Sequence, residues 1–304
     1  MLINSTSHGR VRTDSSTLTF KAVGYLFVGS FAIICLYPFI LMVTGSFTSE
    51  DTILAEGYRL IPTEWSVDSY AIVLETPRLI GGAYLVTILL TTIGTSIGLF
   101  LIAMTGYSLN RKDFALRNHI SFYVYFTTLF TAGIVPFYIM MVRYFNLKDN
   151  YLAVLLPLMM SPWLVILMKN FSKSIPDSIT ESAKIDGAGD FTIFLRLILP
   201  MSKPALASLG LFTALGYWNE WYFSMLFLSP NVPYRPLQLF LYNMIARADF
   251  IRMNAALMNI PPQDIPSESL KLAAAVVATG PIIFVYPFVQ KYFIKGITIG
   301  AVKG

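Results

Sequence analysis

Glu181 is the residue of this chain best placed for chemistry with a partner protein. It lies in a short polar run, residues 180–187, in which Ile179, Ala183 and Ile185 can share one apolar helix face. The Glu181 carboxylate can accept charge-assisted hydrogen bonds from an Arg or Lys of another protein, worth roughly 1.5–3 kcal/mol each. An amphipathic helix resting on lipid headgroups is the alternative, but the run has no Trp, no Phe and no basic face. The run therefore predicts a docking helix.

The residues around Glu181 predict two short helices joined by a glycine turn. The pattern Ser178-x-x-Glu181 indicates a capping box at the start of the first helix. Gly187 suits a left-handed position directly after a helix, because glycine has no Cβ. Asp190 is expected to cap a second helix, Phe191–Leu199.

Catalytic arrangements do not accompany this helix. The sequence contains no Gly-Lys dipeptide, so a phosphate-binding G-x-x-x-x-G-K-[ST] loop is absent. Its two histidines, His8 and His119, and its single cysteine, Cys35, form no metal-ligating or nucleophilic pattern. No metal site and no disulfide within the chain are expected. A self-contained ATPase is excluded, an intramembrane enzyme is disfavoured, and energy must come from another polypeptide.

The long apolar runs of the chain are expected to form membrane helices. Of the 304 residues, 55% are hydrophobic and only 13% are charged, outside ordinary soluble usage. Apolar runs of roughly 20 residues suffice to cross a bilayer as helices. The runs of this chain do not alternate between apolar and polar residues, which excludes a transmembrane β-barrel. The expected fold class is an all-α membrane protein with six transmembrane helices: Phe20–Phe47, Gly82–Leu109, Ile120–Val142, Tyr151–Met168, Pro204–Leu228 and Leu270–Phe293.

The distribution of Lys and Arg predicts the orientation. These residues are roughly twice as frequent on the side that holds the N-terminus as on the opposite side, which places both termini in the cytoplasm. The expected organisation is a tail at 1–19, a six-helix membrane domain at 20–294 and a tail at 295–304. The loop at about 170–203 is then cytoplasmic and the loop at about 229–267 external. The net charge of +5 follows from this bias and needs no nucleic acid.

Two features of the expected spans concern helix packing and a path through the bundle. Gly94-x-x-x-Gly98 permits close helix approach.

The fifth span contains the cluster Tyr217-Trp218-Asn219-Glu220-Trp221. A carboxylate at that depth must face the bundle or water, and aromatic faces suit sugar rings, so the cluster is expected to line the path. An aromatic belt with an interhelical hydrogen bond stays open as the alternative.

The polar run and the residues after it resemble the EAA signature of ABC-importer permeases. That signature is Glu-Ala-Ala, three residues, Gly, nine residues and Ile-x-Leu-Pro. Five positions match it, Glu181, Ala183, Gly187, Leu199 and Pro200, whereas Ser182 and Leu197 depart from it conservatively. The segments Pro266–Lys271 and Gln290–Gly304 resemble those of the carbohydrate-uptake branch, of the MalG and LplC type.

This resemblance implies a permease subunit of an ATP-driven, binding-protein-dependent carbohydrate importer in the bacterial inner membrane, with a type I (MetI-like) fold. The implied partners are a second homologous permease, forming a heterodimer, two ATPase subunits and an extracellular solute-binding protein. The chain itself is then no enzyme and binds no cofactor, since ATP-Mg belongs to the ATPases. The implied ATPase-coupling residues are Glu181, Ser182, Ala183, Asp186, Gly187, Ala188, Leu199 and Pro200, and the implied tail contacts are Gly300, Lys303 and Gly304.

The external loop gives an expectation about the substrate. Its Arg235, Arg247 and Arg252 favour an acidic sugar, because the guanidinium fork matches a carboxylate. The resembling branch includes importers of uronate polymer fragments such as alginate and pectin, so an acidic oligosaccharide is expected. An ion-coupled secondary transporter is the alternative function, and it predicts intramembrane ionisable relays and internal repeats. The sequence offers the lone Glu220 and no convincing repeat.

Overall fold

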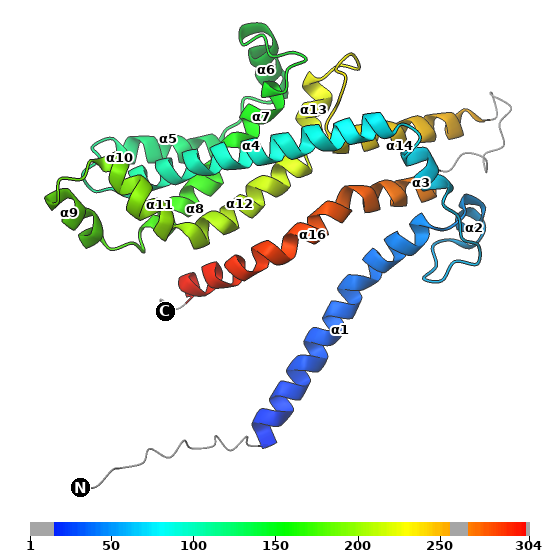
Figure 1. Ribbon diagram of the computed structural model, residues 1–304, viewed down its shortest axis with the longest axis horizontal. Coiled ribbons are helices and arrows are strands. Elements are labelled where there is room, and N and C mark those ends of the chain that lie inside the picture. Colours follow the sequence, from blue (N-terminus) through cyan, green and yellow to red (C-terminus); the bar gives the residue numbers. More distant parts are fainter. Residues whose placement is uncertain (1–14, 256–266, 302–304) are drawn as a thin grey trace.

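A computed structural model describes residues 15–255 and 267–301 as an elongated bundle of helices (Figure 1). Within those two ranges the β structure is limited to one isolated bridge between Thr48 and Trp65. The helices in chain order are α1 (Ser15–Ser46), α2 (Glu50–Glu56), α3 (Asp68–Val73), α4 (Pro77–Asn110), α5 (Arg117–Leu129), α6 (Ile134–Ile139), η1 (Met140–Tyr144), α7 (Leu152–Met159), α8 (Pro162–Ser172), α9 (Asp177–Ile185), α10 (Asp190–Ile193), η2 (Phe194–Ile198), α11 (Leu199–Met201), α12 (Lys203–Trp218), α13 (Tyr222–Phe227), α14 (Leu237–Met253) and α16 (Glu268–Ala301).

Helix α4 is the centre of the bundle and packs against α7, α8 and α12. Its glycines allow this close approach. A Cβ on Gly94 would lie 2.2 Å from the ring of Tyr217, and a Cβ on Gly98 would lie 2.5 Å from the carbonyl oxygen of Met159. The expectation that Gly94 and Gly98 are packing positions is therefore confirmed.

The apolar runs form helices, but several of the expected spans are broken. Within the described ranges, three helices are long and apolar enough to cross a membrane: Leu18–Ser46, Pro77–Asn110 and Leu152–Ser172. The expected third span bends by 115° between Arg117–Leu129 and Ile134–Tyr144. Gly133, with φ at 84°, lies in this break and gives the chain a backbone conformation that other residues rarely adopt.

The fifth and sixth expected spans also differ from their predicted bounds. Helix α12 ends at Trp218, and a short non-helical connection leads into α13. The sixth span lies within α16, which extends to Ala301 and so beyond the expected end of the permease domain at residue 294. At the other end of the chain, α1 begins at Ser15, inside the expected tail.

Helix α1 is covered very little by the rest of the chain. Its side chains from residue 18 to residue 40 are exposed, although most of them are apolar. Figure 1 shows it diverging from the bundle, and it meets α16 near its C-terminal end, where Gly45 faces Leu272. This helix therefore presents an apolar surface that the described part of the chain does not cover.

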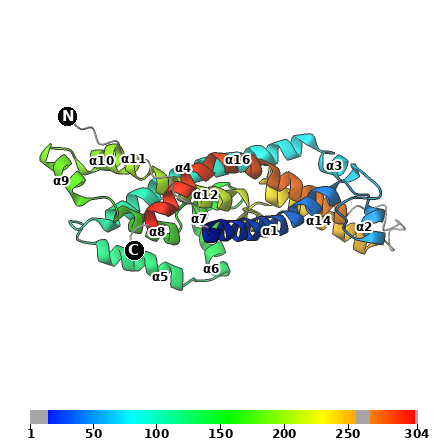
Figure 2. The ribbon, with the colours of Figure 1, turned by 90° about the horizontal axis from the view of Figure 1, so that it is seen from below.

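The two ends of the molecule carry different elements. Helices α9, α10 and α11 lie at one end in both views, and α2, α3 and α14 lie at the other (Figures 1 and 2). An apolar cluster that includes Ile102, Met168 and Phe194 supports the first end. A second cluster, which includes Val73, Leu237 and Ala273, supports the other. The fold thus separates the polar run around Glu181 from the arginine-bearing loop.

Candidate functional site

The polar run folds as α9 followed by a tight glycine turn. Gly187 has φ at 81°, the left-handed conformation expected for it. Its N–H donates to the carbonyl of Lys184 at 3.0 Å, and the N–H of Ala188 donates to the carbonyl of Ala183 at 2.9 Å. This pair of bonds is a Schellman motif, which satisfies the last carbonyls of the helix. The prediction of a glycine turn is confirmed.

The predicted capping box at Ser178 is wrong. The helix begins one residue earlier, at Asp177, with Pro176 as its N-cap and no side-chain hydrogen bond to the cap. Ser178 already lies within the first turn, so its hydroxyl is not in the capping position. The Asp177 carboxylate instead pairs with the Lys112 ammonium at 2.7 Å.

The second helix also departs from its predicted form. It begins at Asp190, continues past Pro200 and ends at Met201, where the chain bends by 81° into α12. Gly189 occupies the N-cap position. The Asp190 carboxylate is therefore free to bind the Arg111 guanidinium at 2.8 Å.

Three residues that follow α4, Arg111, Lys112 and Asp113, hold α9 and α10 in place. Asp113 accepts from Arg111 Nε at 2.8 Å and from Lys184 Nζ at 2.7 Å. Hydrogen bonds from Arg111 and then Lys184 hold the pKa of Asp113 well below its usual range. Exposed ion pairs each contribute about 0–1 kcal/mol, so this clamp fixes orientation more than stability.

The inner side of the α9–α11 unit is apolar. Phe194 is buried between Phe100 and Tyr107, with ring centroids 5.8 and 6.0 Å away. The expected coupling residues Ala183, Ala188 and Leu199 pack against this cluster, together with Leu197. They therefore anchor the unit.

The outer side of the unit is the part that a partner can reach. Glu181, Ser182, Asp186, Gly187 and Pro200 are exposed. Ile185 and Phe191 are also exposed, to 87% and 59%. The apolar pattern of the sequence places Ile185 on one helix face with Ile179 and Ala183, and it does not single out Phe191. Ile185 and Phe191 differ from their neighbours only in being apolar residues within a polar segment. Such residues are normally buried, so residue type alone does not predict their exposure.

Of the expected tail contacts, Gly300 lies in the last turn of α16. Lys303 and Gly304 lie outside the described residues. Across residues 15–255 and 267–301, no cluster of three His, Cys, Asp or Glu side chains is arranged to hold a metal ion.

The cluster from Tyr217 to Trp221 divides into buried and accessible members. Tyr217 is 2% exposed and donates to the Leu155 carbonyl at 2.7 Å, and Trp218 is 9% exposed and donates to the Ala278 carbonyl at 2.9 Å. The buried Glu220 carboxylate accepts from the N–H groups of Phe223 and Ser224 and so caps α13. These three side chains are committed to packing and hydrogen bonding, which favours the alternative of interhelical bonds.

Asn219 and Trp221 are the accessible members. Trp221 is 39% exposed and stacks on Tyr242 of α14, with ring centroids 5.1 Å apart and an interplanar angle of 24°. Gln238 of the same helix donates to the Asn219 amide oxygen at 3.4 Å. Trp221, Gln238, Tyr242 and Lys271 line a cleft of about 270 Å³, here called the aromatic cleft. Gln238 and Tyr242 carry no local signal in the sequence, because only the fold brings α14 beside this cluster.

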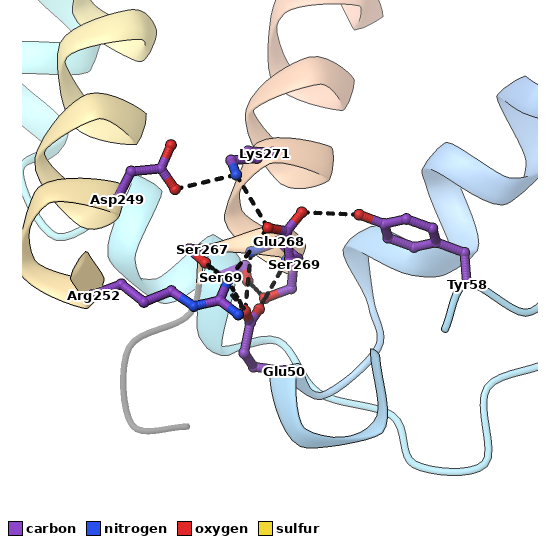
Figure 3. A network of polar contacts seen from close by, with 9 residues as sticks. All are labelled: Glu50, Tyr58, Ser69, Asp249, Arg252, Ser267, Glu268, Ser269 and Lys271. Carbon is purple, nitrogen blue, oxygen red and sulfur yellow. Dashed lines mark hydrogen bonds and ion pairs between the residues drawn. The ribbon is translucent and has the colours of Figure 1, made fainter. Parts of the chain in front are cut away.

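A network around Glu50 joins α2, α14 and α16 at the end of the molecule opposite α9 (Figure 3). The buried Glu50 carboxylate accepts hydrogen bonds from the first two N–H groups of α16, those of Glu268 at 3.0 Å and Ser269 at 2.9 Å. Arg252 lies 3.7 Å from Glu50 and 3.3 Å from Glu268. Burial acts to raise the pKa of Glu50, but these hydrogen bonds outweigh it and leave that pKa below its ordinary value.

Further bonds extend the Glu50 network to neighbouring segments. Lys271 binds both Asp249 and Glu268 at 3.1 Å, and the Tyr58 hydroxyl donates to Glu268 at 3.0 Å. The sequence pattern gave no reason to select Glu50 among the acidic residues of its loop, because its partners lie more than 200 positions away.

Comparison with known proteins adds to this geometry. Residues 98–299 match the family described as binding-protein-dependent transport system inner membrane component. The chain is 37% identical over 287 residues to the polygalacturonan/rhamnogalacturonan transport system permease protein YtcP of Bacillus subtilis (strain 168), covering 94% of this chain and 98% of that protein. It is 34% identical over 304 residues to LplC of the same organism, covering 99% and 98%.

A solved structure is similar as well. A crystal structure of a bacterial ABC transporter involved in the import of the acidic polysaccharide alginate contains a chain that superposes with a TM-score of 0.74 at 29% identity. The match covers 96% of this chain and all of that one.

Proposed function

The chain belongs to the family of binding-protein-dependent transport inner membrane components and is the permease subunit of a sugar ABC importer, and we propose that α9 couples it to the ATPase. ATP hydrolysis resides on a separate subunit, so this chain has to receive motion. The single observation that carries the proposal is the exposed face of α9. It offers the Glu181 carboxylate and the apolar Ile185 on a helix that ion pairs from Lys112 and Asp113 orient.

The contacts of α9 provide a route for that motion. The clamp of Arg111, Lys112 and Asp113 ties α9 to the end of α4, the central helix. At its other end the unit continues through the bend at Ser202 into α12. A displacement of α9 by the ATPases therefore moves α4 and α12 together, switching the pathway between two packings as rigid bodies.

The proposed arrangement in the membrane has six spans, with the end that carries α9 in the cytoplasm and the end that carries α14 outside. The bias of Lys and Arg supports this orientation. The third span is then broken by the bend of 115°, and the fifth is interrupted by the non-helical connection between α12 and α13. Both termini lie in the cytoplasm.

The proposed partners are a second permease, two ATPase subunits with ATP-Mg, and an extracellular solute-binding protein. The apolar and uncovered side chains of α1 support an extended contact with the second permease or with lipid. The substrate proposed is an acidic oligosaccharide, such as a fragment of alginate or pectin. Two of the similar proteins, the polygalacturonan/rhamnogalacturonan permease and the alginate importer, carry names of that class. The aromatic cleft offers ring faces and amides suited to sugars.

The ion-coupled secondary transporter is not proposed for this chain. Such a carrier requires an ionisable relay within the membrane. The expected fifth span offers the lone Glu220, and its carboxylate is engaged as the cap of α13.

The variant Glu181→Ala tests the coupling proposal in the complete reconstituted importer. We expect ATP-dependent uptake to fall by about tenfold or more, since each lost charge-assisted hydrogen bond is worth roughly 1.5–3 kcal/mol. Asp51→Ala is the matched control, because Asp51 is an exposed carboxylate at the opposite end without a hydrogen bond among the described residues. Unchanged uptake in Glu181→Ala, or uptake by the purified chain without any ATPase, contradicts the proposal.

A further inference from the structure

A second and larger cleft lies beside α14. Its volume is about 710 Å³, within the roughly 300–1,000 Å³ typical of ligand pockets. It lies between α14 and the segment that joins α3 to α4. The lining residues include Arg235 and Arg247, the polar Thr76 and Asn243, and the aromatic Phe240. We call it the arginine cleft.

The two guanidinium groups of this cleft have no partner within the described part of the chain. Arg235 is half-buried and Arg247 is exposed, and neither makes a hydrogen bond or an ion pair there. Arg252, the third arginine of the same loop, differs because it is bound to Glu268 and lies close to Glu50. Of the three arginines, two are therefore available to a ligand and one is structural.

The charges that face the cleft favour an anion. Among the described lining residues Glu75 is the one carboxylate, and it forms no ion pair with either arginine. These described residues carry two positive charges against one negative charge. A half-buried guanidinium left without a partner favours a ligand that supplies one, because its fork of N–H donors fits a carboxylate bidentately.

We propose that the arginine cleft binds the uronate carboxylates of the transported oligosaccharide, with Arg235 and Arg247 as the carboxylate-binding residues. This rests on the proposed acidic substrate and assigns residues to its recognition. Asn243 and Thr76 supply polar atoms for sugar hydroxyls, and Phe240 supplies an apolar ring face. The aromatic cleft lies along another face of α14, through Gln238 and Tyr242, so the same helix carries both clefts.

The test compares a charged and a neutral form of one sugar in the reconstituted importer. Uptake rates are measured against concentration for oligogalacturonate and for its methyl ester, which lacks the negative charge. The preference is the ratio of the uptake rate for the free acid to that for the ester. In the double variant Arg235→Gln/Arg247→Gln we expect this ratio to fall by about tenfold or more, because the charge-assisted hydrogen bonds to the carboxylates are lost. Arg247→Gln alone, which removes an exposed side chain without partners in the described chain, is expected to lower the preference in the same direction.

Arg143→Gln is the matched control, because Arg143 is exposed, lies outside the cleft and forms no ion pair in the described ranges. It is expected to keep the wild-type preference. An equal loss for acid and ester in the cleft variants overturns the proposal, since it indicates contact with the solute-binding protein or a damaged fold. An unchanged preference in those variants also overturns it. If the wild-type importer takes up no uronate oligomer, the acidic-substrate proposal itself fails.

Discussion

At the scale of single residues, Trp218 and Trp221 have different environments although they are three positions apart. Trp218 is packed and hydrogen-bonded to the backbone of α16, whereas Trp221 stacks on Tyr242 beside a cleft. We expect Trp218→Ala to lower stability by about 3–5 kcal/mol, seen as a lower melting temperature of the purified importer. Trp221→Ala is expected to spare stability and to raise the KM for sugar by roughly two- to tenfold, through the loss of ring stacking.

The two variants serve as controls for each other. A raised KM with an unchanged melting temperature in Trp218→Ala would show that Trp218 contacts sugar directly. A melting temperature lowered as far in Trp221→Ala as in Trp218→Ala would show that its exposed ring is structural.

Glu50 is a second residue whose role comes from its partners. Its carboxylate binds the first N–H groups of α16, so Glu50→Gln leaves one of these donors without its acceptor oxygen. We expect a loss of about 1–3 kcal/mol of stability, measured by thermal unfolding. Asp51→Asn on the same helix, exposed and without a bonded partner among the described residues, should change stability little.

The pH dependence of this contact follows from the lowered pKa of Glu50. A group whose pKa is lower in the folded protein stabilises it fully above the ordinary glutamate value. That contribution disappears as the pH falls through the lowered pKa. The difference in melting temperature between wild type and Glu50→Gln should therefore shrink in acid. A difference that grows in acid contradicts the assignment.

At the scale of helices, the close packing of α4 depends on glycines. A Cβ on Gly98 would meet a backbone carbonyl at 2.5 Å, and a backbone cannot move aside as a flexible side chain can. We expect Gly98→Ala to lower stability by about 1–3 kcal/mol, the range for overpacked sites, as measured by thermal unfolding of the purified importer. In Gly81→Ala, where nothing lies within 4 Å of the new Cβ, stability should be unchanged or slightly higher.

The helices themselves follow from the sequence, because apolar length is a local property. Their breaks do not. The chain is non-helical from Phe130 to Gly133 and again after Trp218, where the Glu220 carboxylate stabilises the start of α13. A local pattern such as Gly94-x-x-x-Gly98 also predicted its contacts correctly. The glycine pattern predicts a close approach, but the partners of the two glycines, Tyr217 and Met159, are distant in sequence and are identified only by the fold.

The candidate site illustrates the same limit. The matches to the EAA signature placed the docking helix and its Gly187 turn, which are set by backbone geometry. The capping box failed because Asp177 begins the helix and pairs with Lys112, a residue from another loop. The roles of Trp218, Tyr242 and Glu50 likewise depend on contacts between segments distant in sequence. Their residue types alone did not distinguish burial from exposure.

At the scale of the whole molecule, the bundle connects its two ends mechanically. The clamp after α4 holds the α9 end, and the second apolar cluster, which includes the start of α4, packs against α14 and α16 at the other. Motion received at α9 can thus reach the arginine cleft through one continuous central helix. In the proposed orientation, the coupling helix and the arginine cleft lie on opposite sides of the membrane, and that separation leads to a direct prediction.

Labelling of single cysteines checks the predicted orientation of the molecule. In the Cys35→Ser background, Lys173→Cys reports on the α9 end and Met253→Cys on the α14 end, both at exposed positions. With a maleimide that does not cross membranes, Met253→Cys should react in intact cells. Lys173→Cys should react only after the membrane is permeabilised, because the positively charged loops stay in the cytoplasm. The Cys35→Ser chain without a new cysteine gives the background. Labelling of Lys173→Cys in intact cells would invert the arrangement, and α9 would then lie where no ATPase can reach it.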